Sequence, residues 1–312
     1  ADWLSLLSSL PAATAEALSE ADHAYGAYLG TLVKNFINQH QLTPDFIASH
    51  GHTIFHQPQR HISLQLGHGA YLAATAGLPT VCDFRTLDIA LGGQGAPLVP
   101  IGDKLLFPEY EYCVNLGGIA NLSCEINNQR IAFDSCACNM LLNTLAQQKG
   151  LNYDENGQLA RQGQLHEPLF KKLNQAEYFF ANFPKSLGKE WVDRHSLQHL
   201  TEADIPVEDK LHTACHHIAL QLSQSLKALS GKEKAKVLLT GGGAFNTFLV
   251  ELIGQYLGDN FEVVVPEPEL VNFKEALIFA FLGVLRWRNE VNCLSSVTGA
   301  SKDNCGGAVY LS

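Results

Sequence analysis

The stretch from residue 111 to residue 143 constrains the fold more than any other part of this sequence. Its pattern predicts a β-hairpin over residues 112–125 that turns at Gly117-Gly118, and then a strand that ends just before Asp134. A helix is expected to begin at Asn139, so Asp134 lies in a strand-to-helix loop, where open α/β sheets bind ligands. The paired glycines let backbone N–H groups approach an anion such as a phosphate. An acid and an anion cradle on neighbouring turns indicate a kinase.

A second glycine turn, Gly241-Gly242-Gly243, follows a predicted buried strand, and Asn246 is expected to cap the next helix. Three glycines remove every Cβ, so a flat ring or a phosphate can lie against the backbone. The alternative is a tight turn that needs only a positive φ. The turn matches neither G-x-G-x-x-G nor a P-loop, which disfavours both of those nucleotide-binding folds.

Three charged residues are candidates for site chemistry, and each has a structural alternative. Asp134 can act as a catalytic acid or base, or can cap the following turn. Arg85 can bind a substrate carboxylate, or can form an ion pair with Asp83 or Asp88. Glu275 is expected at the start of an apolar helix, where an acid favours the helix dipole. The sequence alone leaves these alternatives open.

Histidines are frequent in two places. Five lie within nineteen residues, and two more are one helical turn apart: His50, His52, His56, His61, His68, His212 and His216. Zinc sites need three or four converging ligands, and no H-E-x-x-H pattern is present. We therefore predict no metal ligand among them, and expect His56 in a polar cleft.

The composition bounds the class of protein. A chain of 312 residues usually forms two lobes, and 46% hydrophobic with 17% charged residues describes a soluble globular protein. The excess of 31 acidic over 21 basic residues argues against nucleic acid or an anionic membrane as a partner. Eight cysteines without a C-x-x-C pair predict reduced thiols, and therefore the cytoplasm. We expect an α/β lobe over residues 1–111 and a second over 112–312, with a helical insertion at about 151–210.

Several segments in this order resemble the anhydro-N-acetylmuramic acid kinase family. They include His56-Gln57-Pro58, Asp83-Phe84-Arg85, the run from Gly92 to Pro100 (GGQGAPLVP), Asn115 to Leu122 (NLGGIANL), Pro184-Lys185-Ser186, Gly241 to Asn246 (GGGAFN), Lys274 to Leu277 (KEAL) and Ser296 to Ala300 (SVTGA).

The resemblance implies a two-lobed actin/hexokinase-like, ribonuclease H-like α/β fold with a central cleft. It also implies ATP and Mg²⁺ as cofactors, and a role in recycling the cell-wall sugar 1,6-anhydro-N-acetylmuramic acid. Family members open the anhydro bridge with water and phosphorylate O6, which gives N-acetylmuramic acid 6-phosphate. Asp134 matches the general base, while His56, Arg85 and Glu275 match positions in the sugar cleft. The positions that match cofactor-binding motifs are Asn115, Gly117, Gly118, Gly241, Gly242, Gly243 and Asn246.

Two departures from the family pattern qualify the resemblance. The chain has DSCACN from Asp134 to Asn139 where the family usually has D-T-G-P-G-N. It also begins on helices, so we expect the family's first strand and phosphate-binding turn to be missing, turnover to be weak, and an unpaired sheet edge to favour a homodimer. The alternatives are a kinase of the same fold for another sugar, and a catalytically silent actin-like binding protein.

Overall fold

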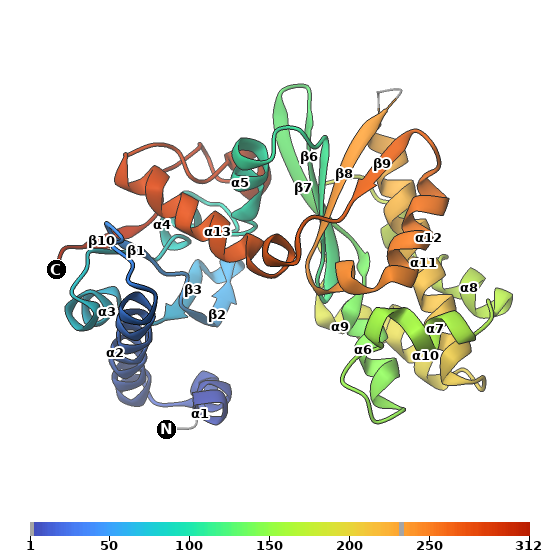
Figure 1. Cartoon of the computed structure of the whole chain (residues 1–312), viewed down its shortest axis with the longest axis horizontal. Coiled ribbons are helices and arrows are strands. Elements are labelled where there is room, and N and C mark those ends of the chain that lie inside the picture. The colour runs from blue at the N-terminus through green and yellow to red at the C-terminus, as the bar shows by residue number, and fades with distance from the viewer. Residues whose placement is uncertain (1–2, 231–233) are drawn as a thin grey trace. The chain divides into compact units, whose positions relative to one another are not determined.

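The computed structural model describes residues 3–230 and 234–312, which form two compact units (Figure 1). One unit combines residues 1–102 with residues 275–312, and we call it the terminal unit. The other comprises residues 103–274, and we call it the central unit. Both contain helices and strands, so the predicted α/β class is confirmed.

The structure divides the chain differently from the predicted lobes 1–111 and 112–312. Strand β10 (Ala308–Tyr310) pairs antiparallel with β4 (Thr80–Cys82), which returns the C-terminal part of the chain to the terminal unit. A long-range strand pairing of this kind leaves no signal in local periodicity, so the boundary predicted near residue 111 was only approximate.

The terminal unit is built on a small sheet and a hairpin. The sheet has the order β1-β4-β10, in which β1 is parallel to β4, and β2 pairs with β3 in a separate hairpin. The other elements of this unit are α1 (Trp3–Ser9), α2 (Ala15–His40), β1 (Ile47–Ala48), β2 (His52–Gln57), β3 (Ile62–Leu66), α3 (Gly69–Ala76), α4 (Thr86–Ala90) and α14 (Ser295–Thr298). Helices α5 (Val99–Leu106) and α13 (Pro268–Trp287) are shared with the central unit.

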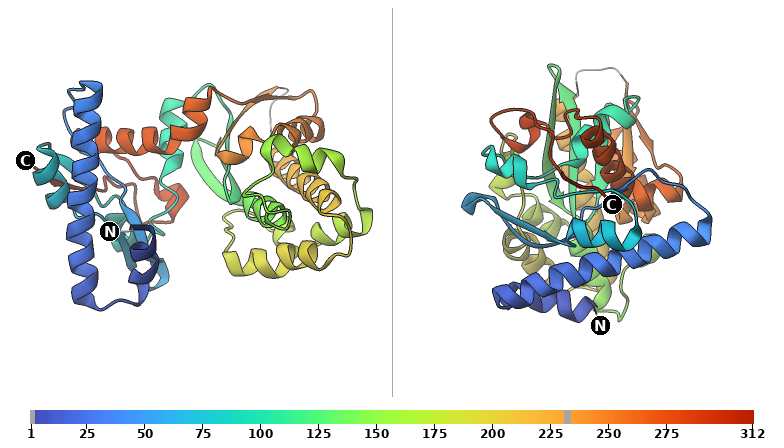
Figure 2. Two further views of the ribbon diagram at one scale, coloured as in Figure 1. Left: turned by 60° about the horizontal axis from the view of Figure 1, so that its bottom comes forward. Right: turned by 90° about the vertical axis from the view of Figure 1, so that its left-hand side faces the viewer.

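Helix α2 is long, and it lies alongside α3 (Figure 2). Its Thr14 N-cap accepts a hydrogen bond from the Ala17 N–H, as an N-terminal cap requires. Two glycines one turn apart, Gly26 and Gly30, face α3 so closely that a Cβ at Gly26 would lie 2.6 Å from the His68 carbonyl oxygen. Glycine therefore allows this helix pair to approach.

The central unit contains a five-stranded sheet of the order β7-β6-β5-β8-β9. Strands β5, β6 and β7 are antiparallel, whereas β8 is parallel to β5 and β9 is parallel to β8. Counted within the unit, this is the order 3-2-1-4-5, which is the topology expected of a ribonuclease H-like fold. The strands are β5 (Tyr112–Leu116), β6 (Ile119–Ile126), β7 (Gln129–Ala137), β8 (Ala235–Thr240) and β9 (Phe261–Val264).

Helices α11 and α12 pack against this sheet (Figure 1). Helix α11 buries Leu211, Cys215, Ile218, Leu222 and Leu226 along one stripe with helical spacing. The insertion at residues 151–210 is largely helical, as predicted. The helices of the unit are α6 (Asn139–Gln147), α7 (Gln158–Gln162), α8 (Glu167–Leu173), α9 (Lys189–Val192), α10 (Gln198–Glu202), α11 (Val207–Leu229) and α12 (Thr247–Leu257). In the described residues, no helix has the length and apolar character to cross a bilayer.

Candidate active site

Asp134 lies inside β7 rather than in the loop that the sequence predicted. The pairing of β7 with β6 continues to Ala137, because the residues beyond Asp134 are buried ones that pack in the core. The register shifts so that Ala120 pairs with Cys136 and Asn121 with Asp134, which leaves Ser135 as the extra residue of a bulge. Bulges redirect side chains next to active sites, and this one adjoins the candidate base.

Three hydrogen bonds fix Asp134. Its carboxylate Oδ2 accepts from the Leu187 N–H at 2.8 Å, and its carbonyl oxygen accepts from the Tyr178 hydroxyl at 2.7 Å. Its own N–H donates to the Lys185 carbonyl oxygen at 3.2 Å. Burial raises the pKa of Asp134, and the Leu187 N–H opposes that shift because it stabilises the carboxylate. A carboxylate with a raised pKa and a fixed orientation is suited to act as a general base.

The Gly117-Gly118 turn lies beside the N-terminus of α6. The Gly117 carbonyl oxygen accepts from the Asn139 N–H at 3.0 Å, and the Gly118 carbonyl oxygen accepts from Cys138 and Met140. Neither glycine has a positive φ, so their backbone could be adopted by other residues. A Cβ on Gly118 would lie 3.2 Å from Met140 Cγ, and close packing is therefore the reason for glycine here.

The Gly241-Gly242-Gly243 turn follows β8 and does require glycine. Gly241 has φ 80° and ψ 166°, a region that residues with a Cβ almost never occupy. A Cβ on Gly241 would contact Asn115 Oδ1, and one on Gly243 would lie 2.7 Å from Leu116 Cβ. The turn thus packs directly on the end of β5. Asn246 caps α12 as predicted, since its Oδ1 accepts from the Leu249 N–H at 3.0 Å.

A cavity of about 490 Å³ opens beside this turn within the central unit. Its volume falls in the range of about 300–1,000 Å³ that is usual for small-molecule sites. The wall combines carboxamides, aromatic rings, bare backbone and the acidic residues Asp154 and Glu155, and its carboxamides and rings fit a flat heteroaromatic ring with hydrogen-bonding edges. Its lining includes Gly242, Gly243, Asn246, Asn139, Asn143, Asn156, Asn272, Tyr153 and Phe245.

This cavity contains three of the predicted cofactor residues, Gly242, Gly243 and Asn246. The other four predicted cofactor residues lie outside its lining: Asn115, Gly117, Gly118 and Gly241. Asn139 connects the cavity to the end of β5, because it lines the cavity and its Nδ2 donates to the Leu116 carbonyl oxygen at 2.9 Å. Sequence reasoning missed the other asparagines that line the cavity. Isolated asparagines carry no spacing signal, and only the fold brings them together.

Arg85 lies in the terminal unit and makes neither of the ion pairs that the sequence offered as alternatives. Its Nε and Nη2 donate to His50 Nε2 at 3.1 and 2.7 Å, and its Nη1 donates to the Gly95 carbonyl oxygen at 2.6 Å. Asp88 is fully buried and accepts instead from Thr298, Asn304 and other donors. Asp83 accepts from the Thr86 hydroxyl at 2.6 Å.

The other two predicted sugar-binding residues lie near Arg85. Partial burial and the positive charge of Arg85 lower the pKa of His56. Burial lowers the pKa of Arg85, and the negative charge of Glu275 opposes that shift. The terminal unit therefore brings His56, Arg85 and Glu275 into one electrostatic group.

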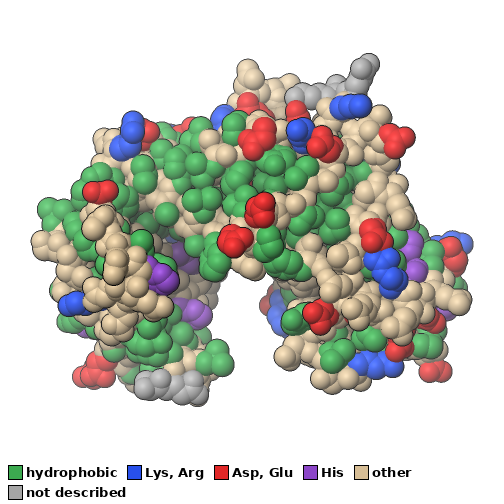
Figure 3. Space-filling view, in the orientation of Figure 1, with side chains coloured by type: hydrophobic (Ala, Val, Ile, Leu, Met, Phe, Trp, Pro, Cys, Tyr) green, Lys and Arg blue, Asp and Glu red, His purple; other side chains and the backbone are tan. Residues whose placement is uncertain are grey.

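His50 is a residue of this group that the sequence did not single out. Its Nδ1 lies 3.0 Å from the Gly51 carbonyl oxygen and acts as the donor, which leaves Nε2 as the acceptor for Arg85. Burial and the charge of Arg85 lower the pKa of His50 to about 4, so it is neutral near pH 7. Histidine side chains reach the surface at several places, as Figure 3 shows.

Comparison with known proteins shows the family to which the chain is similar. The sequence model of the family "Anhydro-N-acetylmuramic acid kinase" matches residues 3–312. This chain belongs to that family. Proteins of the same name are 32% identical over 308 residues in Vibrio parahaemolyticus and 34% identical over 313 residues in Saccharophagus degradans. Each alignment covers 95% of this chain, and 83% and 84% of the respective relative.

Solved structures give weaker likenesses. An activator of 2-hydroxyisocaproyl-CoA dehydratase from Clostridium difficile aligns with a TM-score of 0.40 at 18% identity, covering 73% of this chain and 87% of that one. A ROK family glucokinase from Streptomyces griseus, in complex with glucose and AMPPNP, has a TM-score of 0.30 at 14% identity, with coverage of 70% and 73%.

The DSCACN segment, which departs from the usual pattern of the anhydro-N-acetylmuramic acid kinase family, contains the bulge at Ser135 and an irregular backbone conformation at Cys138. No residue from Ser135 to Asn139 has a positive φ. The segment continues β7 to Ala137 and then enters α6 at Asn139. A positive φ is therefore not required in this segment, but Cys138, which stands at the second glycine of the family pattern, has φ −129° and ψ −99°, outside the usual α and β regions.

The histidine pair on α11 has a structural role. His216 Nε2 lies 3.1 Å from His212 Nε2, His216 Nδ1 lies 2.9 Å from the Tyr256 hydroxyl, and His212 Nδ1 lies 2.8 Å from the Ala160 carbonyl oxygen. This chain of hydrogen bonds ties α11 to α12 and α7. Across residues 3–230 and 234–312, no three His, Cys, Asp or Glu side chains form a group that could hold a metal ion.

Proposed function

We propose that this chain is an ATP-dependent kinase that opens the 1,6-anhydro bridge of anhydro-N-acetylmuramic acid and phosphorylates O6. Membership of a family named for that kinase, over residues 3–312, supports the enzyme class and the substrate. The observation that carries the chemistry is the fixed carboxylate of Asp134, in the same unit as a glycine-lined cavity.

Asp134 is the proposed general base. A water molecule attacks the anomeric carbon of the sugar and transfers a proton to the ionised carboxylate of Asp134. The bond from the anomeric carbon to the bridge oxygen breaks, and this oxygen becomes O6 and attacks the γ-phosphorus of ATP. The bond to the β-phosphate oxygen then breaks and ADP leaves, so the products are N-acetylmuramic acid 6-phosphate and ADP.

The nucleotide is proposed to bind in the central unit. The cavity beside Gly242 and Gly243 takes the adenine and ribose, because its carboxamides and exposed Phe245 ring suit a flat polar heterocycle. The loop hydrogen bonds of the described residues use the carbonyl groups of Gly117 and Gly118 but not their N–H groups. We assign these N–H groups to phosphate oxygens. Mg²⁺, when bound with ATP, neutralises phosphate charge during the transfer, and we name no protein ligand for it.

The sugar is proposed to be recognised by the terminal unit. Arg85 has a planar guanidinium that is suited to the lactyl carboxylate of the substrate. His50 holds the guanidinium through a neutral acceptor, so the positive charge of Arg85 is kept for the anionic substrate. His56 and Glu275 offer hydrogen bonds to the sugar hydroxyl and amide groups.

Replacing Asp134 by Asn tests this assignment. We expect turnover of ATP and the anhydro-sugar to fall by about 10²–10⁴-fold, since a general base contributes this much. Binding of the sugar should stay measurable by calorimetry. The control is Asp193→Asn, which changes an exposed acid of the same unit that pairs with Lys189. An Asp134→Asn variant that keeps wild-type turnover would show that another residue is the base.

The same assay separates the alternative functions. ADP release with a different sugar, but not with the anhydro-sugar, would favour a kinase of the same fold with another substrate. Binding of ATP without phosphoryl transfer to any sugar would favour an actin-like binding protein.

We further propose a cytoplasmic location, where ATP is available, and self-association as a homodimer. Strand β1 supports the second point, because in the described sheet it pairs only with β4 and its other edge is open. Light scattering across a range of protein concentrations tests the oligomeric state.

A further inference from the structure

The strand that carries Asp134 lies at an edge of the central sheet, because β7 is the first strand in the order β7-β6-β5-β8-β9. The outward backbone groups of an edge strand need partners from outside the sheet. At Asp134 these partners come from residues 178–187, which we call the edge strap. The Lys185 carbonyl oxygen accepts from the Asp134 N–H, and the Tyr178 hydroxyl donates to the Asp134 carbonyl oxygen.

The edge strap also fixes the Asp134 side chain. The Leu187 N–H donates to Oδ2 at 2.8 Å, so the strap holds the carboxylate as well as the backbone. Three hydrogen bonds that join the strap to β7 thus end on the same residue. A segment that only covered the strand edge would need no bond to this carboxylate.

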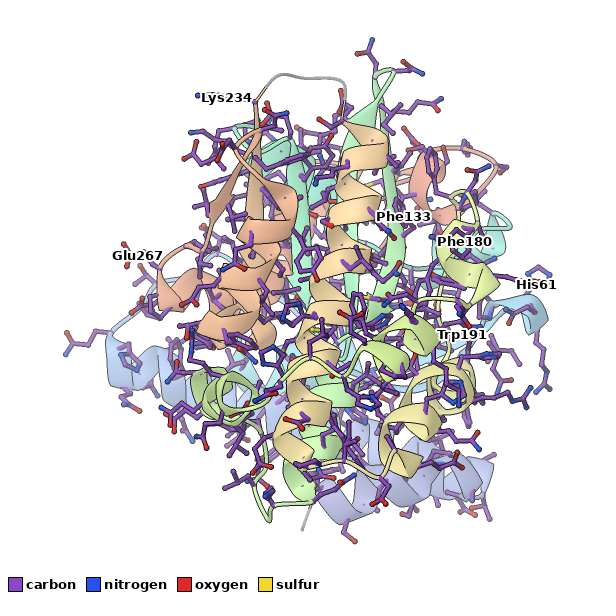
Figure 4. The ribbon with its side chains drawn as sticks, turned by 90° about the vertical axis from the view of Figure 1, so that its right-hand side faces the viewer. His61, Phe133, Phe180, Trp191, Lys234 and Glu267 are labelled. Atoms are coloured by element: carbon purple, nitrogen blue, oxygen red, sulfur yellow. The ribbon has the colours of Figure 1, made fainter. Side chains whose placement is uncertain are left out.

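Side-chain contacts within the edge strap and with β7 hold the strap in place. Lys185 Nζ donates to the Tyr178 carbonyl oxygen at 3.1 Å and lies 4.9 Å from the centre of the Tyr178 ring. The Phe183 ring stacks on Phe133 of β7 with centroids 5.8 Å apart. Figure 4 shows Phe133 in the same region of the unit as Phe180 of the strap and the neighbouring Trp191. The strap is therefore held in one place before it contacts Asp134.

We propose that the edge strap orients the carboxylate of Asp134 for proton abstraction, and that Tyr178 is the positioning residue on which this orientation depends. The proposal rests on the proposed function, in which Asp134 is the base. Tyr178 contacts neither reacting atom in this scheme. It acts by holding the backbone from which the carboxylate projects, and near-attack geometry is sensitive to shifts of about 1 Å.

Tyr178→Phe tests the proposal, because it removes the hydroxyl and keeps the ring that packs under Lys185. We expect kcat to fall about tenfold, the effect of losing one hydrogen bond that is needed in the transition state. The KM for ATP should stay within about twofold of the wild type, since the adenosine cavity is not touched. The matched control is Tyr28→Phe, the same chemical change on an exposed tyrosine of α2.

The pH profile distinguishes positioning from a loss of folded protein. Tyr178, Lys185 and Cys136 are the titratable groups that interact with Asp134 or its immediate surroundings. Water admitted at the vacated hydroxyl relieves the burial that raises the pKa of Asp134, so the acid limb of kcat/KM should move to lower pH. If Tyr178 only kept the protein folded, the variant would lower kcat/KM by the same factor at every pH, and the acid limb would not move.

The two variants distinguish a failure of this proposal from a failure of the proposed function. If Tyr178→Phe keeps wild-type kcat and an unmoved acid limb while Asp134→Asn is inactive, the edge strap does not position the base and the proposed function stands. If Asp134→Asn keeps full activity, the proposed function fails first. A second variant, Lys185→Met, removes the side-chain contacts of Lys185 with Tyr178 and leaves its backbone bond to Asp134 in place, and we expect the same shift of the acid limb with a smaller loss of kcat.

Discussion

Replacing Gly241 by Ala tests whether the glycine turn after β8 is needed for folding rather than only for ligand access. Gly241 has φ 80° and ψ 166°, which costs about 1–3 kcal/mol for a residue with a Cβ. The new Cβ would also contact Asn115 Oδ1 and lie 3.0 Å from the Leu116 carbonyl oxygen. Crowding of this kind adds about 1–3 kcal/mol. We therefore expect a loss of about 2–6 kcal/mol in the free energy of unfolding.

Gly242→Ala is the matched control, because its neighbourhood is open. Gly242 has no positive φ, and its Cβ would meet only Asn139 Nδ2 at an ordinary 3.6 Å. We expect little change in stability, but weaker ATP binding, since Gly242 and Asn139 both line the cavity.

Urea unfolding followed by circular dichroism measures the first effect, and calorimetric ATP titration measures the second. A loss of about 3 kcal/mol corresponds to a fall of roughly 6–12 °C in the Tm of a unit of this size. The reasoning is refuted if Gly241→Ala melts within about 1 °C of the wild type. It is also refuted if Gly242→Ala is destabilised as much as Gly241→Ala, because the backbone conformation would then not be the cause.

Three further predictions follow from buried groups. Burial raises the pKa of Asp134 in the folded protein, so the folded state becomes less stable as pH rises and this carboxyl group ionises. Asp134→Asn, which cannot ionise, should therefore be at least as stable as the wild type at pH 7 in a thermal melt. Lys274→Met should cost about 1.5–3 kcal/mol by urea unfolding, since Asp103 loses a buried cation at 2.7 Å but keeps Arg130 at 3.8 Å. His50→Leu should raise the KM for the anhydro-sugar about tenfold in steady-state assays, because Arg85 loses the acceptor that orients it.

Each of these has a control or a contradicting result. Lys189→Met removes an exposed cation that pairs with Asp193, and it should leave the unfolding curve unchanged. Lys274→Met with the same curve as Lys189→Met would show that the buried pair is dispensable. An unchanged KM in His50→Leu would mean that Arg85 does not depend on His50. A clear loss of stability in Asp134→Asn would mean that the charged form is favoured in the folded state.

Local patterns predicted much of the fold. The hairpin of β5 and β6 and the start of α6 at Asn139 lie where alternation and helix-start signals placed them. The Asn246 cap was also predicted from the sequence, because a cap depends on neighbours within a few residues. The motifs that resemble the family lie in order along the chain, and the family match over residues 3–312 confirms that identification.

The errors occurred where structure depends on distant partners. Asp134 lies in β7 rather than in a loop because β6 continues to pair beyond it. The asparagines that line the cavity and the residues of the edge strap form no local sequence pattern, since their contacts join residues tens of positions apart.

The sequence by itself determined the class of fold, the two glycine turns and the identity of the candidate base. Only the tertiary structure decided the partner of each polar group: Arg85 binds His50 across 35 residues, and Asp88 accepts from Cys293 across 205. The physical reason is that a buried charge must be satisfied by whichever donor or acceptor the packed chain brings within about 3 Å, and that choice is made by long-range packing rather than by sequence neighbours.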